Sequence, residues 1–312
     1  MKTTKIPKNN FRRGLNWGWR QKAKTKTCPP EPRLDHKVIV ITGGNSGVGL
    51  ETVKGLLSRG AEVIFLARNK AKSENVVKSL DGNVHFVQLD LGDLDTLNAA
   101  IIGIQNILNG RTIDTFICNA GIGANYPHTL SPQGYELTFS VNVLGHHVLF
   151  KELHTNQFLS SKAHIIAVTG DLYFQADDCT PHYEYKGSRS MQAYARSKVG
   201  VMWWGLQCHK QYPEYKVNLV HPGVIPMGLG ADQNSIMIRI MSAILLSPEG
   251  GAQTTLNCVT QPDIENGAYY HNTMGKAILP EDDIALDIGK SRVFWNTLET
   301  IYEAECKSKE LK

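Results

Sequence analysis

The chain has 312 residues, of which 42% are hydrophobic and 20% charged, and its formal net charge is +4. This composition supplies a buried core and excludes an intrinsically disordered chain, and the length suits one α/β domain. The sequence has neither a run of eighteen apolar residues nor a secretory signal segment, so an intracellular protein, cytoplasmic rather than organellar, is expected.

Residues 1–30 contain nine basic residues and no acidic one, so the other 24 basic and 29 acidic residues leave a net charge of −5. The segment has no strong hydrophobic period. Residues 1–35 are therefore predicted to form a flexible tail ahead of a domain at 36–312. Trp17 and Trp19 leave open a contact with a membrane surface or a partner, and the basic composition leaves organellar targeting open.

From Lys37 onward, short apolar runs alternate with longer amphipathic stretches. The apolar runs predict strands at 38–41, 63–66, 84–87, 115–118, 164–168 and 217–220. The stretches between them predict helices near 48–59, 70–80, 93–109, 133–154 and 191–211. This alternation is typical of βαβ units in a Rossmann-type, doubly wound parallel sheet, where ligands bind at the carboxyl ends of the strands.

A glycine-rich turn follows the first predicted strand and opens a helix. It reads Thr42-Gly43-Gly44-Asn45-Ser46-Gly47-Val48-Gly49. Glycines permit a tight turn and a close approach to a pyrophosphate, and the free N–H groups at a helix start attract its negative charge. The turn therefore predicts a dinucleotide site, with Gly43, Asn45, Ser46, Gly47, Val48 and Gly49 as cofactor-binding residues.

The second strand ends in Ala67-Arg68-Asn69, where an acidic residue would accept hydrogen bonds from the ribose of NAD. Because a guanidinium binds a 2′-phosphate bidentately, Arg68 favours NADP, with NAD and a plain surface arginine as the alternatives. The next two strands end in Asp90-Leu91 and Asn119-Ala120-Gly121, where the adenine and the nicotinamide ribose would lie.

The predicted helix 191–211 carries Tyr194 and Lys198, four residues apart and therefore on one helical face. A phenol has a pKa of about 10 and exchanges protons near neutrality only when a cation stabilises its phenolate, which Lys198 would do. Alone, the pair also fits a solvated helix face. Beside a dinucleotide site it predicts a proton-transfer centre.

These motifs together resemble the short-chain dehydrogenase/reductase family across about residues 36–280. The resemblance rests on TGxxxGxG at 42–49, Asp90, Asn119-Ala120-Gly121, Asn142, Tyr194-xxx-Lys198 and Pro222-Gly223. Within the family the chain is most similar to the retinol dehydrogenase branch and to the oxidoreductase domain of the WW-domain-containing oxidoreductase, although no WW domain is present. Asn45-Ser46-Gly47-Val48-Gly49, Ala67-Arg68-Asn69, the stretch 141–146, Val220-His221-Pro222-Gly223 and Gly267-Ala268-Tyr269-Tyr270 carry that closer similarity.

The resemblance implies an NADP(H)-dependent oxidoreductase that interconverts an alcohol and an aldehyde or ketone. Tyr194 would be the catalytic acid or base, and Lys198 would lower its pKa and bind the nicotinamide ribose. Asn142 would hold a water in the proton relay, or alternatively would be a satisfied buried amide. Pro222, Gly223 and Val224 would complete the cofactor site.

One position departs from the family pattern. The fifth strand is followed by Thr169-Gly170-Asp171, and Gly170 stands where the family has its catalytic serine. Loss of a comparable donor costs about 2.7–4 kcal/mol, roughly 10²–10³ in turnover, so a slow enzyme is expected. Thr169 would replace the serine only through a local bulge. The alternative is a nucleotide-binding scaffold or redox sensor with impaired catalysis.

Residues 222–248 are apolar and rich in methionine, and the resemblance implies a substrate lid at about 224–247. Such a lid suits a lipid-like substrate such as a retinoid, steroid or fatty aldehyde, while a packed helix or a subunit contact, and with it a homo-oligomer, stays open. Met227 replaces a family Thr or Ser that contacts the nicotinamide. No nucleic-acid partner is expected, and the six cysteines, without CxxC or metal-ligand spacing, indicate neither a metal nor disulfides.

Overall fold

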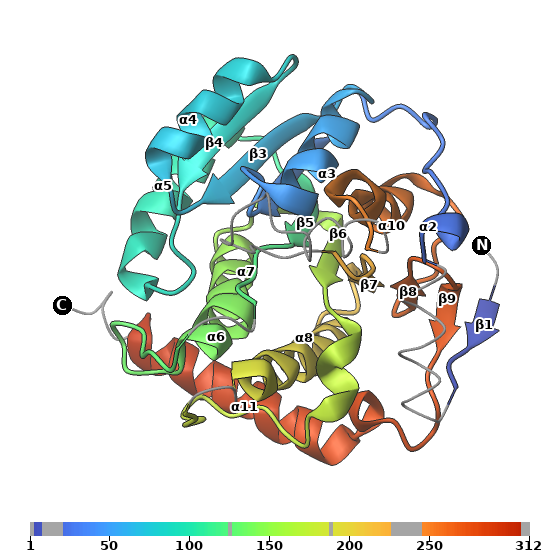
Figure 1. Cartoon of the computed structure of the whole chain (residues 1–312). Coiled ribbons are helices and arrows are strands. Elements are labelled where there is room, and N and C mark those ends of the chain that lie inside the picture. Colours follow the sequence, from blue (N-terminus) through green and yellow to red (C-terminus); the bar gives the residue numbers. More distant parts are fainter. Residues whose placement is uncertain (1–2, 8–20, 124–126, 187–189, 226–244, 307–312) are drawn as a thin grey trace, which may run out of the picture.

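The computed structural model describes residues 3–7, 21–123, 127–186, 190–225 and 245–306. Its strands form one nine-stranded sheet in the order β1-β9-β8-β7-β6-β5-β2-β3-β4. The strands are β1 (Thr3–Lys5), β2 (Val38–Thr42), β3 (Glu62–Ala67), β4 (Val84–Gln88), β5 (Ile113–Cys118), β6 (Leu159–Val168), β7 (Lys216–His221), β8 (Tyr269–His271) and β9 (Gly275–Ile278). All neighbouring strands run parallel except β8 and β9. The predicted doubly wound α/β fold is confirmed (Figure 1).

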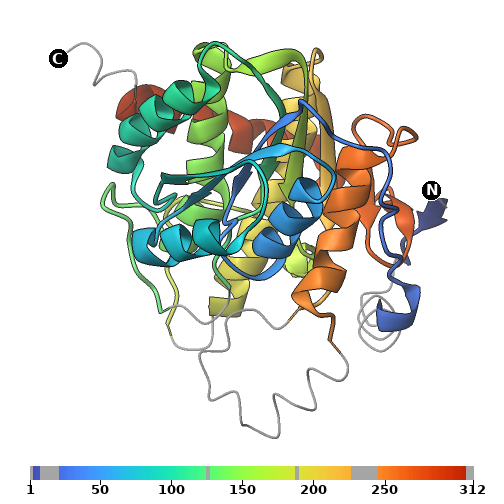
Figure 2. The same ribbon diagram turned by 90° about the horizontal axis from the view of Figure 1, so that it is seen from above.

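Helices cover both faces of this sheet (Figures 1 and 2). The α-helices are α2 (Gln21–Lys24), α3 (Gly47–Leu57), α4 (Lys70–Ser79), α5 (Leu97–Leu108), α6 (Leu137–Phe139), α7 (Gly145–Thr155), α8 (Ser190–Gln211), α10 (Pro248–Thr260) and α11 (Ile288–Glu305). Short helical turns are η1 (Leu94–Thr96), η2 (Ser140–Leu144), η3 (Asp171–Gln175) and η5 (Ile284–Leu286). The first core cluster contains residues of α5, α7, α8 and α11, and the second contains residues of α3 and α10.

The strand β2 shows why the sheet needs both layers. Val38 and Val40 belong to one hydrophobic cluster and Ile39 and Ile41 to the other, and all four side chains are buried. Successive side chains of a strand point to opposite faces, so a continuous apolar run is stable only between two layers of helices. The carboxyl ends of the parallel strands then meet at one edge.

The described parts of the N-terminal region differ from the expected flexible tail. β1 pairs with β9, and the buried side chain of Gln21 forms two hydrogen bonds with the main chain of Val224, at 2.9 and 3.0 Å. The main-chain N–H of Cys28 donates to Gln253 at 2.7 Å. The edge strand β9 offers unpaired main-chain groups to an extended segment, so tertiary pairing of β1 outweighs the basic composition of the region. The tryptophans at 17 and 19 lie outside the described residues.

Two other regions also differ from the sequence-based expectations. The helix expected at 133–154 begins at Leu137 and is divided by the π-helical turn η2, and α10, β8 and β9 were not predicted. Most of the expected lid, with Met227, lies outside the described residues, which include its ends at 224–225 and 245–247. Across the described ranges, no helix is both long enough and apolar enough to span a membrane.

Candidate active site

A cleft of about 150 Å³ opens at the carboxyl ends of β2, β3, β4 and β5. Seven residues that the sequence predicts for the cofactor line it: Gly43, Asn45, Arg68, Asp90, Leu91, Ala120 and Gly121. The remaining lining comes from neighbouring residues of the same strand ends, including Thr42 and Ile122, and from Val141 of η2. The structure therefore brings together residues that follow four different strands, because parallel strands place their carboxyl ends side by side.

The glycines of the turn are required by close backbone packing. Gly43 has φ of +73°, and a Cβ on Gly49 would lie 2.2 Å from the main-chain oxygen of Gly43. Ser46 precedes α3, and its side chain makes no capping hydrogen bond to that helix. The first N–H groups of α3 therefore lack this internal acceptor at the place where a pyrophosphate would bind. Asn45 instead holds the turn by donating to Ser73 at 2.9 Å.

Arg68 lies beside Asp90 at the rim of the cleft. Its Nε is 3.8 Å from Asp90 Oδ2, and the two side chains are 63% and 29% exposed. At this distance and exposure the ion pair is weak. The Arg68 guanidinium is thus available to an anionic ligand in the cleft.

A chain of hydrogen bonds joins the loop after β5, at the cleft, to Asn142. The main-chain N–H groups of Asn119 and Ala120 donate to Thr42 Oγ1, each at 2.9 Å, and Thr42 Oγ1 lies 2.8 Å from His146 Nε2. His146 Nδ1 then donates to the main-chain oxygen of Asn142 at 3.2 Å. Burial lowers the pKa of His146 to about 4, so the ring is neutral and its two nitrogens have opposite roles.

Asn142 lies inside the π-helical turn η2, a feature often found at functional sites. Its Oδ1 accepts from the main-chain N–H of Ile122 at 2.8 Å, and its Nδ2 donates to Ile122 O and Ser197 Oγ. The side chain is thus a fully satisfied buried amide that fixes the loop after β5 against α8. The sequence gives no signal for Ser197 or for the Thr42–His146 contact, which are set by tertiary packing.

Tyr194 and Lys198 lie on one face of α8, as their spacing predicts. Lys198 Nζ is 5.5 Å from the centre of the Tyr194 ring and donates to the main-chain oxygen of Val168 at 3.2 Å. Burial lowers the pKa of Lys198 to about 8. Burial and then the charge of Asp171 raise the pKa of Tyr194 to about 12, which differs from the expected lowering by Lys198. The main reason is that the phenol is buried, which disfavours its charged form, and Asp171, which the sequence did not single out, adds to this effect.

Gly170 faces Tyr194 at the end of β6. A Cβ built on Gly170 would lie 3.3 Å from the Tyr194 hydroxyl oxygen. Thr169 does not fill this place, because its hydroxyl is buried and donates to the main-chain oxygen of Lys198 at 3.2 Å. Neither Gly170 nor Thr169 therefore places a side-chain hydroxyl beside the Tyr194 phenol.

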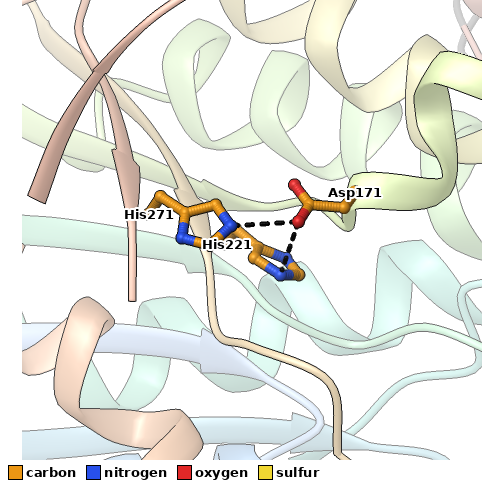
Figure 3. A group of neighbouring side chains, drawn as sticks. All are labelled: Asp171, His221 and His271. Carbon is orange, nitrogen blue, oxygen red and sulfur yellow. Dashed lines mark hydrogen bonds and ion pairs between the residues drawn. The ribbon is translucent and has the colours of Figure 1, made fainter. Parts of the chain in front are cut away.

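Four further polar side chains, those of Asp171, His221, Tyr269 and His271, contact one another at the end of β6. Asp171 Oδ2 lies 2.9 Å from His271 Nε2 and 3.2 Å from His221 Nε2 (Figure 3). Tyr269 donates to Asp171 Oδ1 at 3.0 Å. The ligand atoms of Asp171, His221 and His271 all lie within 4.8 Å of one another, which is compatible with a metal ion. However, the N–H of Thr273 donates to His271 Nδ1, so the proton of this ring is on Nε2 and points at the carboxylate.

The cofactor residues predicted after β7 lie next to this group. Gly223 has φ of +98°, and a Cβ there would lie 2.4 Å from the side chain of Leu246. Both main-chain groups of Val224 are held by Gln21. Pro222, Gly223 and Val224 thus form a fixed connection at the carboxyl end of β7.

Comparisons with known proteins agree with this geometry. The model of the family described as "short chain dehydrogenase" matches residues 37–235. Retinol dehydrogenase 14 of Mus musculus is 28% identical over 302 residues, 87% of each chain. The WW domain-containing oxidoreductase of Homo sapiens is 29% identical over an alignment of 258 positions that covers 76% of this chain and 61% of that one. The crystal structure of an uncharacterized Mycobacterium paratuberculosis protein superimposes with a TM-score of 0.71, at 23% identity, covering 89% of this chain and 98% of that chain.

Proposed function

Since this chain belongs to the short-chain dehydrogenase family and is an oxidoreductase, we propose that it interconverts an alcohol and an aldehyde or ketone with Tyr194 as its acid and base. The observation that carries the proposal is the position of Tyr194. Its phenol faces Gly170, and Lys198 lies one helical turn away. Gly170 follows β6, at the same carboxyl ends of the strands where the cleft opens.

NADP is the proposed cofactor. Arg68 lines the cleft, and its ion pair with Asp90 is weak, so its guanidinium would bind a 2′-phosphate. The glycine turn and the N-terminus of α3 would hold the pyrophosphate, and Asp90 and Leu91 would border the adenine. When bound, the nicotinamide supplies or accepts the hydride of the reaction.

The residues of this chain would position the substrate oxygen and move a proton. Tyr194 Oη would give a proton to the carbonyl oxygen in reduction and take it back in oxidation. Lys198 would bind the nicotinamide ribose and place positive charge next to the phenol once it leaves Val168 O. Asn142 would keep the loop after β5 in position for the cofactor. Without a hydroxyl at Gly170, the developing oxyanion lacks one donor, so turnover would be slow.

A small lipophilic alcohol or carbonyl compound is the proposed substrate class. The support is the similarity to proteins named retinol dehydrogenase and the apolar sequence of 224–247. A homo-oligomer and a membrane contact through the N-terminal region remain predictions.

Turnover across a panel of retinoid, steroid and fatty aldehydes and alcohols tests the proposal. We expect measurable NADP-dependent turnover in the native protein and at least a roughly hundredfold loss in Tyr194→Phe, since the ring stays but the transferable proton is removed. Tyr183→Phe is the matched control, because Tyr183 is a partly exposed tyrosine whose hydroxyl donates to Gln192 and whose ring contacts with Arg196 and Tyr185 are kept by phenylalanine. Equal rates in the native and Tyr194→Phe proteins would contradict the enzymatic role.

The second candidate function is a nucleotide-binding scaffold or redox sensor. Gly170 favours it, since the position facing the phenol has no hydroxyl. Tight NADP binding combined with turnover that does not depend on Tyr194 would identify this function.

A further inference from the structure

Gln21 is buried against the segment that follows β7. Its side chain is 1% exposed, its Nε2 donates to the main-chain oxygen of Val224 at 3.0 Å, and its Oε1 accepts from the Val224 N–H at 2.9 Å. A side-chain amide that serves both main-chain groups of one residue bonds it as a neighbouring strand would. Val224 itself is 42% exposed, so hydrogen bonds to its main chain, rather than burial of its side chain, hold it in place.

Residues 222–225 begin beside the proposed reacting centre. The N–H of Thr169 donates to the main-chain oxygen of Val220 at 2.9 Å, so β7 ends next to the strand end that carries Gly170. Gly170 in turn faces the Tyr194 hydroxyl. The chain that leaves β7 therefore starts close to the place where the substrate oxygen would bind.

The same segment ends at the glycine turn. A Cβ built on Gly251 of α10 would lie 2.4 Å from Ile225 Cδ1 and 2.9 Å from Val48 Cγ2, so these two side chains lie close together. Val48 belongs to the first turn of α3, where the pyrophosphate would bind. A dinucleotide that extends from this turn to Tyr194 would therefore pass residues 222–225 with its nicotinamide half.

The main chain that carries Gln21 is attached to the domain at further points. Thr25 Oγ1 accepts from Asn272 Nδ2 at 2.9 Å, and the Cys28 N–H donates to Gln253 Oε1 at 2.7 Å. Asn272 follows β8, and Gln253 lies in α10. The amide of Gln21 is thus a preorganised partner for the segment after β7, because its own main chain is already fixed.

We propose that Gln21 is a positioning residue of the cofactor site, through which the N-terminal segment forms part of the support for the nicotinamide half. The inference rests on the proposed function. Gln21 acts through the Val224 peptide, which it holds in one orientation before the cofactor binds. Without the two hydrogen bonds, binding would have to order residues 222–225, and this loss of conformational freedom lowers the affinity for a dinucleotide that reaches them.

Calorimetric titration of Gln21→Met with NADP and with adenosine 2′,5′-bisphosphate tests the proposal. Methionine has nearly the shape of glutamine, but it has no donor for the Val224 oxygen and only a weak acceptor for the Val224 N–H. We expect the Kd for NADP to rise roughly tenfold, since two hydrogen bonds that order the site are lost. The Kd for adenosine 2′,5′-bisphosphate should not change, because this fragment lacks the nicotinamide half.

Gln261→Met is the matched control. Gln261 Nε2 donates to the main-chain oxygen of Glu31 at 3.2 Å, so this glutamine also bonds the N-terminal segment, but at the end of α10. We expect this variant to bind both ligands as the native protein does. A weaker Kd for NADP in Gln261→Met, equal to that of Gln21→Met, would contradict a specific role of Gln21.

An unchanged Kd for NADP in a folded Gln21→Met protein would overturn the inference. A lower Kd would also overturn it, since Gln21 would then compete with the cofactor for the Val224 main chain. An equal loss of affinity for NADP and for adenosine 2′,5′-bisphosphate would mean that Gln21 only stabilises the fold.

Hydrogen exchange of the native protein decides if Gln21→Met does not fold. The Val224 amide should be protected before NADP is added, and free exchange of this amide until NADP binds would contradict the positioning role. Failure of the proposed function is distinguishable, because the native protein would then bind no NADP or show turnover that Tyr194→Phe leaves unaffected.

Discussion

Gly170 and Tyr194 face each other across the candidate active site, with 3.3 Å between the Cβ position of the glycine and the hydroxyl oxygen of the tyrosine. Because of this contact, the absence of a side chain at residue 170 directly affects the surroundings of the Tyr194 hydroxyl. It also means that a hydroxyl added at 170 would lie beside the phenol and the substrate oxygen.

Gly170→Ser is therefore expected to speed turnover. The backbone at Gly170 is extended, with φ of −157°, which serine adopts without strain. A restored donor to the oxyanion corresponds to roughly 10²-fold in kcat. Steady-state kinetics measure the change, and Gly170→Ala is the matched control because it adds the Cβ without the hydroxyl. A serine variant no faster than the alanine variant would mean that another donor already serves the substrate oxygen.

Arg68→Gln is expected to weaken NADP binding and to leave NAD binding unchanged. Loss of charge-assisted hydrogen bonds to a 2′-phosphate costs about 1.5–3 kcal/mol, or roughly ten- to a hundredfold in Kd. Calorimetric titration with both cofactors gives the two Kd values. Arg33→Gln removes another exposed arginine, paired with Asp35, and should change neither value. An equal effect of Arg68→Gln on NAD and NADP would contradict recognition of the 2′-phosphate.

Gly49→Ala is expected to weaken both cofactors together. The added Cβ would lie 2.2 Å from the main-chain oxygen of Gly43, so the turn has to open. Overpacking of this kind costs about 1–3 kcal/mol. If this strain falls on the cofactor-bound conformation of the turn, the affinity decreases roughly five- to a hundredfold. Gly289→Ala has room at the start of α11, with Asp287 Oδ1 at 3.4 Å, and serves as control. Normal affinity in Gly49→Ala would show that the cofactor does not need this turn.

The protein is expected to lose stability as the pH falls from about 6.5 to 4. Burial lowers the pKa of His146, His164 and His221 to about 4, while unfolded histidines titrate near 6.5. Between these values the unfolded state binds more protons, so the free energy of unfolding decreases as pH falls and is insensitive to these groups above pH 7.

Urea unfolding at several pH values measures this slope. His164→Gln, which keeps an amide donor near Asn218, should reduce the pH dependence of the free energy of unfolding by up to one bound proton. A free energy of unfolding that stays constant from pH 7 to 5 would contradict neutral buried histidines.

The apolar runs along the sequence made much of the sheet predictable. The six strands predicted from apolar runs are all present, and their carboxyl ends lie within one residue of the expected positions, as at Thr42 and Ala67. The edge elements β1, β8 and β9 were missed, because such short segments become strands only by pairing with a neighbour. The helix α10 begins at Pro248 behind a serine cap, a signal that was readable in the sequence but was not used.

The sequence by itself determined the class of the sheet, the glycine turn before α3 and the pairing of Tyr194 with Lys198, since each depends on residues within a few positions of one another. The tertiary structure decided the rest. It brought Asp171, His221 and His271 together from strand ends 50 residues apart, turned Lys198 to Val168, and fixed the N-terminal segment on Val224. These contacts depend on the order of strands in the sheet and on burial, which no local pattern specifies, and they set the charge around the phenol.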